Sequence, residues 1–219
     1  MFYKPGTDAH GLAHDPFKSC VIPRPIGWIS TLSTDGIANL APFSQFQNLS
    51  YRPPYVMFSA NKATNAKQKD SVINAEGTGE FVWNMATYEL REAVNKSAQE
   101  VPPEVDEFDL AGLDKAPSNL VKAPRVAQSP VQFECAYHMT VGLPGPGNMK
   151  STDMVIGRVL GIHVDEEALT EDGRLDVLRL RPIARLGYYD YTSIESVFEM
   201  VIPGENEALL AGLEGQTSG

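Results

Sequence analysis

The chain has 219 residues, of which 42% are hydrophobic, and its 28 acidic and 18 basic side chains give a formal charge of −10. This composition is typical of a globular protein, and the length is within the range of a single all-β domain. The acidic balance argues against nucleic acids and anionic membranes as partners, because both favour proteins with a basic face.

The cysteines and the apolar pattern predict a cytoplasmic protein. Cys20 and Cys135 have no paired spacing, so they predict neither a disulfide framework nor a zinc site. The first residues lack the apolar core of a signal peptide, and no apolar run is long enough to span a bilayer. We therefore expect no membrane association.

Residues 1–22 are predicted to form an irregular N-terminal arm. His10 and His14 are four residues apart, a spacing that would place two metal ligands on one face of a helix. Gly11 and the nearby Pro5 and Pro16 disfavour a helix, so solvated surface is the better interpretation and no metal site is predicted.

The segment from Arg24 to Asn48 predicts a β-hairpin. Side chains alternate from Ile26 to Ser33, which is the period-two pattern of a strand. Thr34-Asp35-Gly36 supplies a turn, and Ile37–Leu40 is expected to return as a second strand that Pro42 interrupts. Short polar side chains gather in this hairpin and its exit. They bond to backbone or water in one interpretation and hold a ligand in the other.

The sequence next predicts a strand over Tyr55–Ala60. It then predicts a helix from Asn65 to about Ala75, with Thr64 as its N-cap and Gly77 as the residue that ends it. The stretch Ser59–Ser71 joins a strand end, hydroxyl groups and lysines. It is either a phosphate cradle or a solvated basic helix face.

The rest of the chain is predicted to alternate strands, turns and short helices. A lone strand histidine such as His138 is more often structural than catalytic. Gly157 and Gly161 are expected to mark bulges or bends. The predicted segments are a rigid corner at Leu49–Pro54, a strand at Phe81–Met85, a helix at Tyr88–Ser97 capped by Thr87, a loop at 99–119 with a helical turn near Glu104–Phe108, a strand at Val131–Val141, a hairpin loop at Gly142–Asn148, a strand at Asp153–Val164, a solvated turn at Asp165–Asp176, a closing edge at Leu180–Tyr191 and a helix at Glu205–Leu213.

Strands separated by turns, with few helices between them, favour a closed or nearly closed antiparallel barrel. The ordered series PRPIGWIST, DG, NLAPFSQF, PPYVMFS, KDS and GEFVWN, read from Pro23 to Asn84, resembles the flavin reductase-like family. Weaker similarity continues to about Tyr191. The resemblance implies a mainly β, antiparallel FMN-binding split barrel with a few short helices, of the flavoredoxin-like branch. It divides the chain into the arm at 1–22, the FMN-binding domain at 23–195 and a C-terminal extension at 196–219.

The resemblance also implies a set of cofactor-binding residues. The isoalloxazine ring would lie along the hairpin with Trp28 near its edge, and the phosphate would lie against Ser59–Ser71. Ser71 stands where many relatives have threonine, and both residues keep the hydroxyl group. The implied set is Trp28, Ser30, Thr31, Pro42, Ser44, Asn48, Ser59, Ala60, Asn61, Lys69, Asp70 and Ser71.

FMN is the implied cofactor, with FAD as an alternative and NAD(P)H as co-substrate. The protein would bind and orient the flavin while the flavin itself accepts hydride, so no catalytic residue is assigned. Three functions follow: an NAD(P)H:flavin oxidoreductase, a flavoredoxin-like FMN electron carrier without direct NAD(P)H activity, and a β-barrel binding module without redox activity. The implied partners are a second copy, with flavin near the dimer interface, and a monooxygenase or another electron acceptor.

Overall fold

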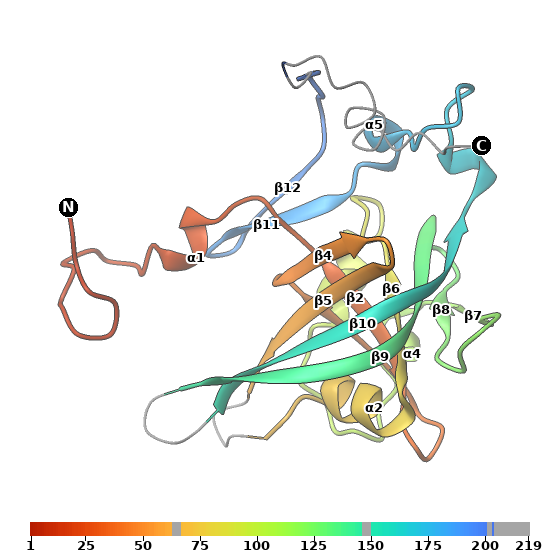
Figure 1. Cartoon of the computed structure of the whole chain (residues 1–219), viewed down its shortest axis with the longest axis horizontal. Helices are drawn as coiled ribbons and strands as arrows, with labels where there is room; N and C mark the ends of the chain where they lie inside the picture. The colour runs from red at the N-terminus through yellow and green to blue at the C-terminus, as the bar shows by residue number, and fades with distance from the viewer. Residues whose placement is uncertain (63–66, 146–149, 201–202, 204–219) are drawn as a thin grey trace.

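The computed structural model describes residues 1–62, 67–145, 150–200 and 203, and its centre is a curved antiparallel sheet (Figure 1). The sheet has seven strands in the order β3-β2-β6-β9-β10-β5-β4. The fold is thus the mainly β split barrel that the sequence predicts, with a few short helices. The strands of this sheet are β2 (Gly27–Leu32), β3 (Ala38–Phe43), β4 (Phe46–Tyr51), β5 (Pro54–Asn61), β6 (Glu80–Asn84), β9 (Val131–Pro144) and β10 (Lys150–Val164).

Two smaller sheets and several short helices accompany this sheet. β1 (Arg24–Pro25) pairs with β11 (Ile183–Gly187), which pairs with β12 (Asp190–Ser193), and β7 (Lys115–Ala116) pairs with β8 (Arg125–Val126). Within the described ranges, no helix is both long enough and apolar enough to cross a bilayer. The helices are α1 (Phe17–Cys20), α2 (Asp70–Thr78), α3 (Arg91–Lys96), α4 (Glu107–Ala111), the 3-10 turn η1 (Glu166–Ala168) and α5 (Val177–Leu180).

Strand β2 packs against hydrophobic side chains on both of its faces. Ile29 belongs to a core with Phe58 and Phe81, whereas Trp28 belongs to a second core with Leu40 and Phe108. The alternation predicted from Ile26 to Ser33 is therefore correct, but neither face of the strand is open to solvent.

The predicted hairpin is confirmed, with two corrections. β2 and β3 pair from Gly27 opposite Phe43 to Leu32 opposite Ala38, so the ladder continues through Pro42. Proline is tolerated there because β3 lies at an edge of the sheet, where one side of the backbone has no ladder partner. The corner predicted at Leu49–Pro54 is confirmed at Arg52-Pro53, which turn from β4 into β5, but Leu49–Tyr51 belong to the strand β4, which pairs with β5. It was missed because five of its six residues are exposed, so it lacks an alternating pattern.

The predicted helices are displaced or shortened. α2 begins at Asp70, because Lys69 is extended, and it ends at the left-handed Gly79 rather than near Gly77. α3 begins only at Arg91, and α4 begins at Glu107 after its N-cap Asp106. The proposed Thr64 cap and the C-terminal helix at Glu205–Leu213 lie outside the described residues, as does part of the Gly142–Asn148 loop.

The β9–β10 hairpin bends where glycines were expected to bend it. Register shifts fall between Ile156 and Gly157 and between Val159 and Gly161. A Cβ atom at Gly157 would lie 2.3 Å from Cε1 of Phe81, whose ring is fully buried in the core. Glycine is needed at this position because the aromatic ring packs directly against the backbone.

We therefore expect Gly157→Ala to lower the free energy of unfolding by about 1–3 kcal/mol, since the Phe81 ring must shift within a packed core. Urea denaturation would measure this change. Gly77→Ala is the matched control, because a Cβ there meets only the Thr34 methyl group at 3.5 Å and alanine favours the helix. The control should leave stability unchanged or raise it. Equal destabilisation by both substitutions would contradict the packing argument.

Candidate functional site

The sequence-predicted cofactor residues divide into a buried group and an accessible group. Six of them are buried in the described structure, and six are partly or fully exposed. The buried residues are Trp28, Ser30, Thr31, Ser59, Ala60 and Ser71, and the accessible residues are Pro42, Ser44, Asn48, Asn61, Lys69 and Asp70.

Trp28 contacts only the interior of the protein. Its ring is fully buried, and its Nε1–H donates a hydrogen bond of 2.9 Å to Oγ of Ser97. The structure therefore does not bring Trp28 to a surface that a flavin could reach. The ring is anchored in the core that β2 shares with α3 and α4.

The hydroxyl groups of Ser30 and Thr31 are satisfied within the protein. Ser30 donates to the carbonyl of Pro124 at 2.6 Å. Thr31 donates to Oδ1 of Asn39 at 3.3 Å and accepts from the amide of Asn74 at 3.1 Å. For these two residues, the interpretation as internal hydrogen bonding is the one that the structure supports. Their side chains hold β2 against its neighbours.

Asn39 is the centre of this buried polar network. Its side-chain amide donates to both carboxylate oxygens of Glu107, at 2.9 and 3.0 Å, and its Oδ1 accepts from Ser71 at 2.8 Å. Glu107 also accepts from the backbone N–H of Leu40 at 3.0 Å. The predicted phosphate ligand Ser71 therefore already has a protein partner, and burial raises the pKa of the Glu107 carboxyl above its ordinary value.

The predicted phosphate cradle at the start of α2 has its nearest cation already paired. Lys69 forms an ion pair with Glu100, and this hydrogen bond lowers the pKa of the Glu100 carboxyl. Asp70 follows as the first helical residue, and burial raises its pKa while Lys69 opposes that shift. A phosphate bound here would have to displace Glu100 and tolerate Asp70.

Two accessible predicted residues, Ser44 and Asn61, meet in a cleft of about 560 Å³, which we call the cationic cleft. Its lining residues include members of α1, β1, β5 and β11 and the residues that follow β3. α1 lies beside the β11–β12 hairpin (Figure 1). Gly187 allows this approach, because a Cβ there would lie 2.1 Å from Oγ of Ser19. The cleft is lined by His14, Asp15, Lys18, Arg24, Ser44, Gln45, Asn61, Arg185, Gly187, Tyr188 and Tyr189.

Three of the lining side chains are cations that form no ion pair with any described carboxylate. Arg24 instead donates to the carbonyls of Lys18 and Val21, the latter at 2.9 Å. Arg185 donates to the carbonyl of Tyr188. The cleft therefore carries concentrated positive charge in a protein whose formal charge is −10.

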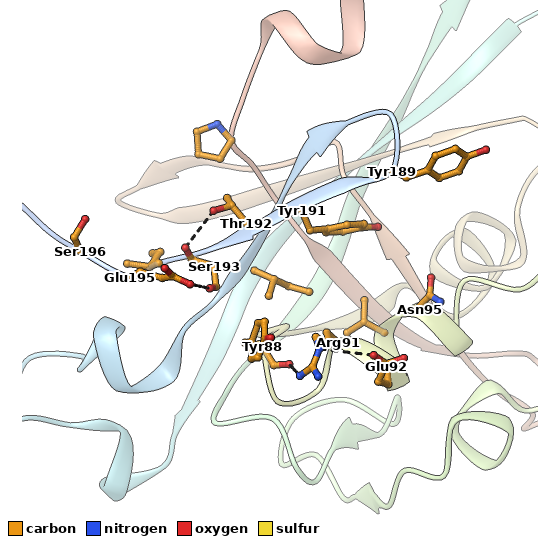
Figure 2. A pocket seen from close by; sticks show the side chains of 14 residues that line it. Tyr88, Arg91, Glu92, Asn95, Tyr189, Tyr191, Thr192, Ser193, Glu195 and Ser196 are labelled. Carbon is orange, nitrogen blue, oxygen red and sulfur yellow. Dashed lines mark hydrogen bonds and ion pairs between the residues drawn. The ribbon is translucent and has the colours of Figure 1, made fainter. Parts of the chain in front are cut away.

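A second, larger cleft of about 780 Å³ lies beside the same hairpin (Figure 2). Tyr88 is stacked between the guanidinium groups of Arg91 and Arg181, which lie 4.1 and 4.0 Å from its ring centre. Unlike the cations of the cationic cleft, these arginines have carboxylate partners, and Arg91 pairs with Glu92. None of the sequence-predicted cofactor residues lines this cleft, but Tyr189 borders both.

Sequence reasoning missed the three cations of the cationic cleft, which are Lys18, Arg24 and Arg185. Arg24 stands between two prolines in the motif that carried the family resemblance, and Arg185 belongs to the Arg-Leu pair of the closing segment. Their positions within these two motifs were the only features of the sequence analysis that could have pointed to the two arginines as ligand-binding residues. Their proximity could not be read from the sequence, because it depends on the pairing of β1 with β11.

The comparisons with known proteins decide the family. The model of the flavin reductase like domain matches residues 19–192. The chain belongs to the flavin reductase-like family. An uncharacterized protein of Aquifex aeolicus is 41% identical to this family member over 171 residues, which cover 77% of this chain and 84% of the relative.

Solved structures of the same fold support this assignment. Nitrilotriacetate monooxygenase component B from Bacillus cereus has a TM-score of 0.84 and 28% identity, with 91% of this chain and 98% of that chain covered. Flavoredoxin of Desulfovibrio vulgaris (Miyazaki F) has a TM-score of 0.70 and 20% identity, with 91% and 97% covered, and therefore shows the fold alone.

The histidines singled out in the sequence do not gather. His10 packs at a tilt against Tyr3, His14 packs edge-on against Tyr188, and His138 packs edge-on against Tyr55. Within the described ranges, no group of three or more metal-ligating side chains comes together.

The raised pKa of Glu107 predicts a pH effect on stability. The folded protein holds a proton on Glu107 at pH values where the unfolded chain, with an ordinary value of 4.5, has released it. Stability should therefore fall as pH rises above about 4.5. Glu107→Gln should remove this contribution.

Urea denaturation of the wild type and Glu107→Gln between pH 4 and 8 would measure the effect. Relative to the variant, the wild type should lose stability as the pH rises. Glu171→Gln, on an exposed turn, is the matched control and should follow the wild type at every pH. A wild-type-to-Glu107→Gln difference that is constant with pH would show that the buried carboxyl does not titrate as we expect.

Proposed function

We propose that this protein is an FMN-binding oxidoreductase that transfers hydride from NAD(P)H to flavin. The observation that carries the proposal is the cationic cleft, where Ser44 and Asn61 lie with three cations that pair with no described carboxylate. In a protein of formal charge −10, such a cleft favours an anionic ligand over the bulk surface. Membership of the flavin reductase-like family makes flavin the leading candidate.

The residues of the cleft are compatible with a flavin nucleotide. Its volume of about 560 Å³ lies within the usual range for small-molecule sites. Ser44 offers a hydroxyl group, Asn61 an amide, and the tyrosines at the rim offer aromatic surface. Bound FMN would supply the hydride-accepting ring, while the protein binds, orients and tunes it. We propose that Ser44 and Asn61, the predicted residues that line the cleft, contact it. Pro42 and Asn48 are accessible but do not line the cleft, and their role as flavin contacts stays a prediction.

The same proposal covers the remaining ligands and partners. FAD is the alternative flavin, and NAD(P)H is the reductant. The similarity to a protein described as nitrilotriacetate monooxygenase component B supports a monooxygenase, or another electron acceptor, as the recipient of electrons. We further propose a cytoplasmic homodimer with flavin near the interface, and a division into the arm at 1–22, the domain at 23–195 and the extension at 196–219.

The visible absorbance of the purified protein, reconstituted with FMN, tests the function directly. Addition of NADH or NADPH under anaerobic conditions should bleach the absorbance of bound flavin. A yellow protein that neither coenzyme bleaches would instead support a flavoredoxin-like electron carrier. Protein that takes up no flavin would support a binding module without redox activity.

Ser44→Ala tests the placement of the flavin. Loss of one hydrogen bond should weaken FMN binding by roughly threefold to tenfold, measured by quenching of flavin fluorescence. Ser50→Ala is the matched control, because Ser50 is an exposed serine of β4 outside the cationic cleft, bonded to the carbonyl of Pro53. Equal FMN affinity in Ser44→Ala and the control would rule out a contact from Ser44.

A further inference from the structure

Arg24 and Arg185 are directly opposite each other on two paired strands. The antiparallel pairing of β1 with β11 sets Arg24 opposite Arg185 and Pro25 opposite Ala184. Like charges at opposed positions destabilise a sheet unless a counter-charge lies between or beside them. Both arginines line the cationic cleft, and the Arg185 guanidinium also lies over the Tyr191 ring, 4.5 Å from its centre.

The described residues do not neutralise the charge around this pair. Lys18 adds a third cation, and neither it nor the arginines form an ion pair with a described carboxylate. Among the described residues, Asp15 is the only carboxylate that lines the cleft, and it accepts from the backbone N–H of Phe17 at 2.9 Å. Positive charge therefore exceeds negative charge among the lining side chains.

A buried donor of Arg24 also lacks an acceptor. Its Nε is buried and has no hydrogen-bond partner in the described structure, although Nη1 bonds to two carbonyls. Buried donors in native proteins are nearly always satisfied, so an orphaned guanidinium N–H points to a missing acceptor. The planar guanidinium favours bidentate acceptors, of which phosphate is one.

We propose that Lys18, Arg24 and Arg185 form an anion site that takes a phosphate group of a nucleotide. This inference deepens the proposed function and rests on it for the identity of the nucleotide. The phosphate belongs either to the flavin nucleotide or to the pyridine dinucleotide that reduces it. The site is separate from the sequence-predicted cradle at α2, where Lys69 is paired with Glu100.

Titration of the flavin-free full-length protein with inorganic pyrophosphate tests the anion site without any redox assay. Calorimetry at low ionic strength should show binding, which Arg185→Gln weakens by about tenfold. Arg158→Gln is the matched control, because Arg158 is an exposed arginine of β10 that lies outside both clefts and forms no ion pair with a described carboxylate. It should bind pyrophosphate like the wild type. Lys18→Gln provides a second variant if Arg185→Gln folds poorly by circular dichroism.

The source of the phosphate is separated by comparing ligands. If Arg185→Gln weakens FMN but not riboflavin, the flavin supplies the phosphate. If it leaves FMN unchanged and raises the KM for NAD(P)H, the dinucleotide supplies it. Equal affinity of wild type and Arg185→Gln for pyrophosphate, or unchanged constants for both nucleotides, would overturn the proposal. Wild-type protein that binds pyrophosphate but no flavin would refute the proposed function, and the titration would still decide the anion site.

Discussion

Burial of β2 on both faces is the constraint on which the rest of the structure depends. Ile29 packs into the barrel interior, while Trp28 packs outward under α3 and α4. A strand between two cores cannot slip by one residue, because every side chain would then face the wrong core. The register of β2 with β3 and β6 is thereby fixed, and β3 delivers Ser44 to the rim of the cationic cleft.

The buried polar network explains how this strand carries hydroxyl groups without a large energetic penalty. Thr31, Asn39 and Ser71 bond to one another or to Glu107, so β2, β3, α2 and α4 are tied together. Such networks are stable when every member is satisfied. The side chains in this network already have protein partners and are not available to a ligand. The candidate site lies instead at the end of the hairpin away from its turn, where Ser44 follows β3.

Electrostatic contrast distinguishes the two clefts beside the β11–β12 hairpin. In the larger cleft, Arg91 lies on Tyr88 and pairs with Glu92 (Figure 2). In the cationic cleft, Arg24 and Arg185 donate to backbone carbonyls, Arg185 also lies over the Tyr191 ring, and neither pairs with a described carboxylate. Carbonyl groups orient a guanidinium but leave its charge uncompensated. An anion is accordingly better placed in the smaller cleft, even though the larger one offers more volume.

The sequence by itself predicted those strands, turns and bends that depend only on residues close together in the chain. The alternation of β2, the turn at Gly36, and the bends at Gly157 and Gly161 follow from neighbouring residues, and the ordered motifs between Pro23 and Asn84 identified the family. The strand β4 was not predicted because five of its six residues are exposed, so burial does not alternate along it.

Only the tertiary structure decided which polar residues are free to bind a ligand. Ser30 and Ser44 look alike in the sequence, yet Ser30 is bonded to Pro124 from a distant loop, whereas Ser44 opens onto a cleft. Arg24 meets Arg185 because β1 pairs with β11 near the other end of the chain. Period-two patterning tells which side a residue faces but not what covers that side, because the covering residues come from elements remote in sequence.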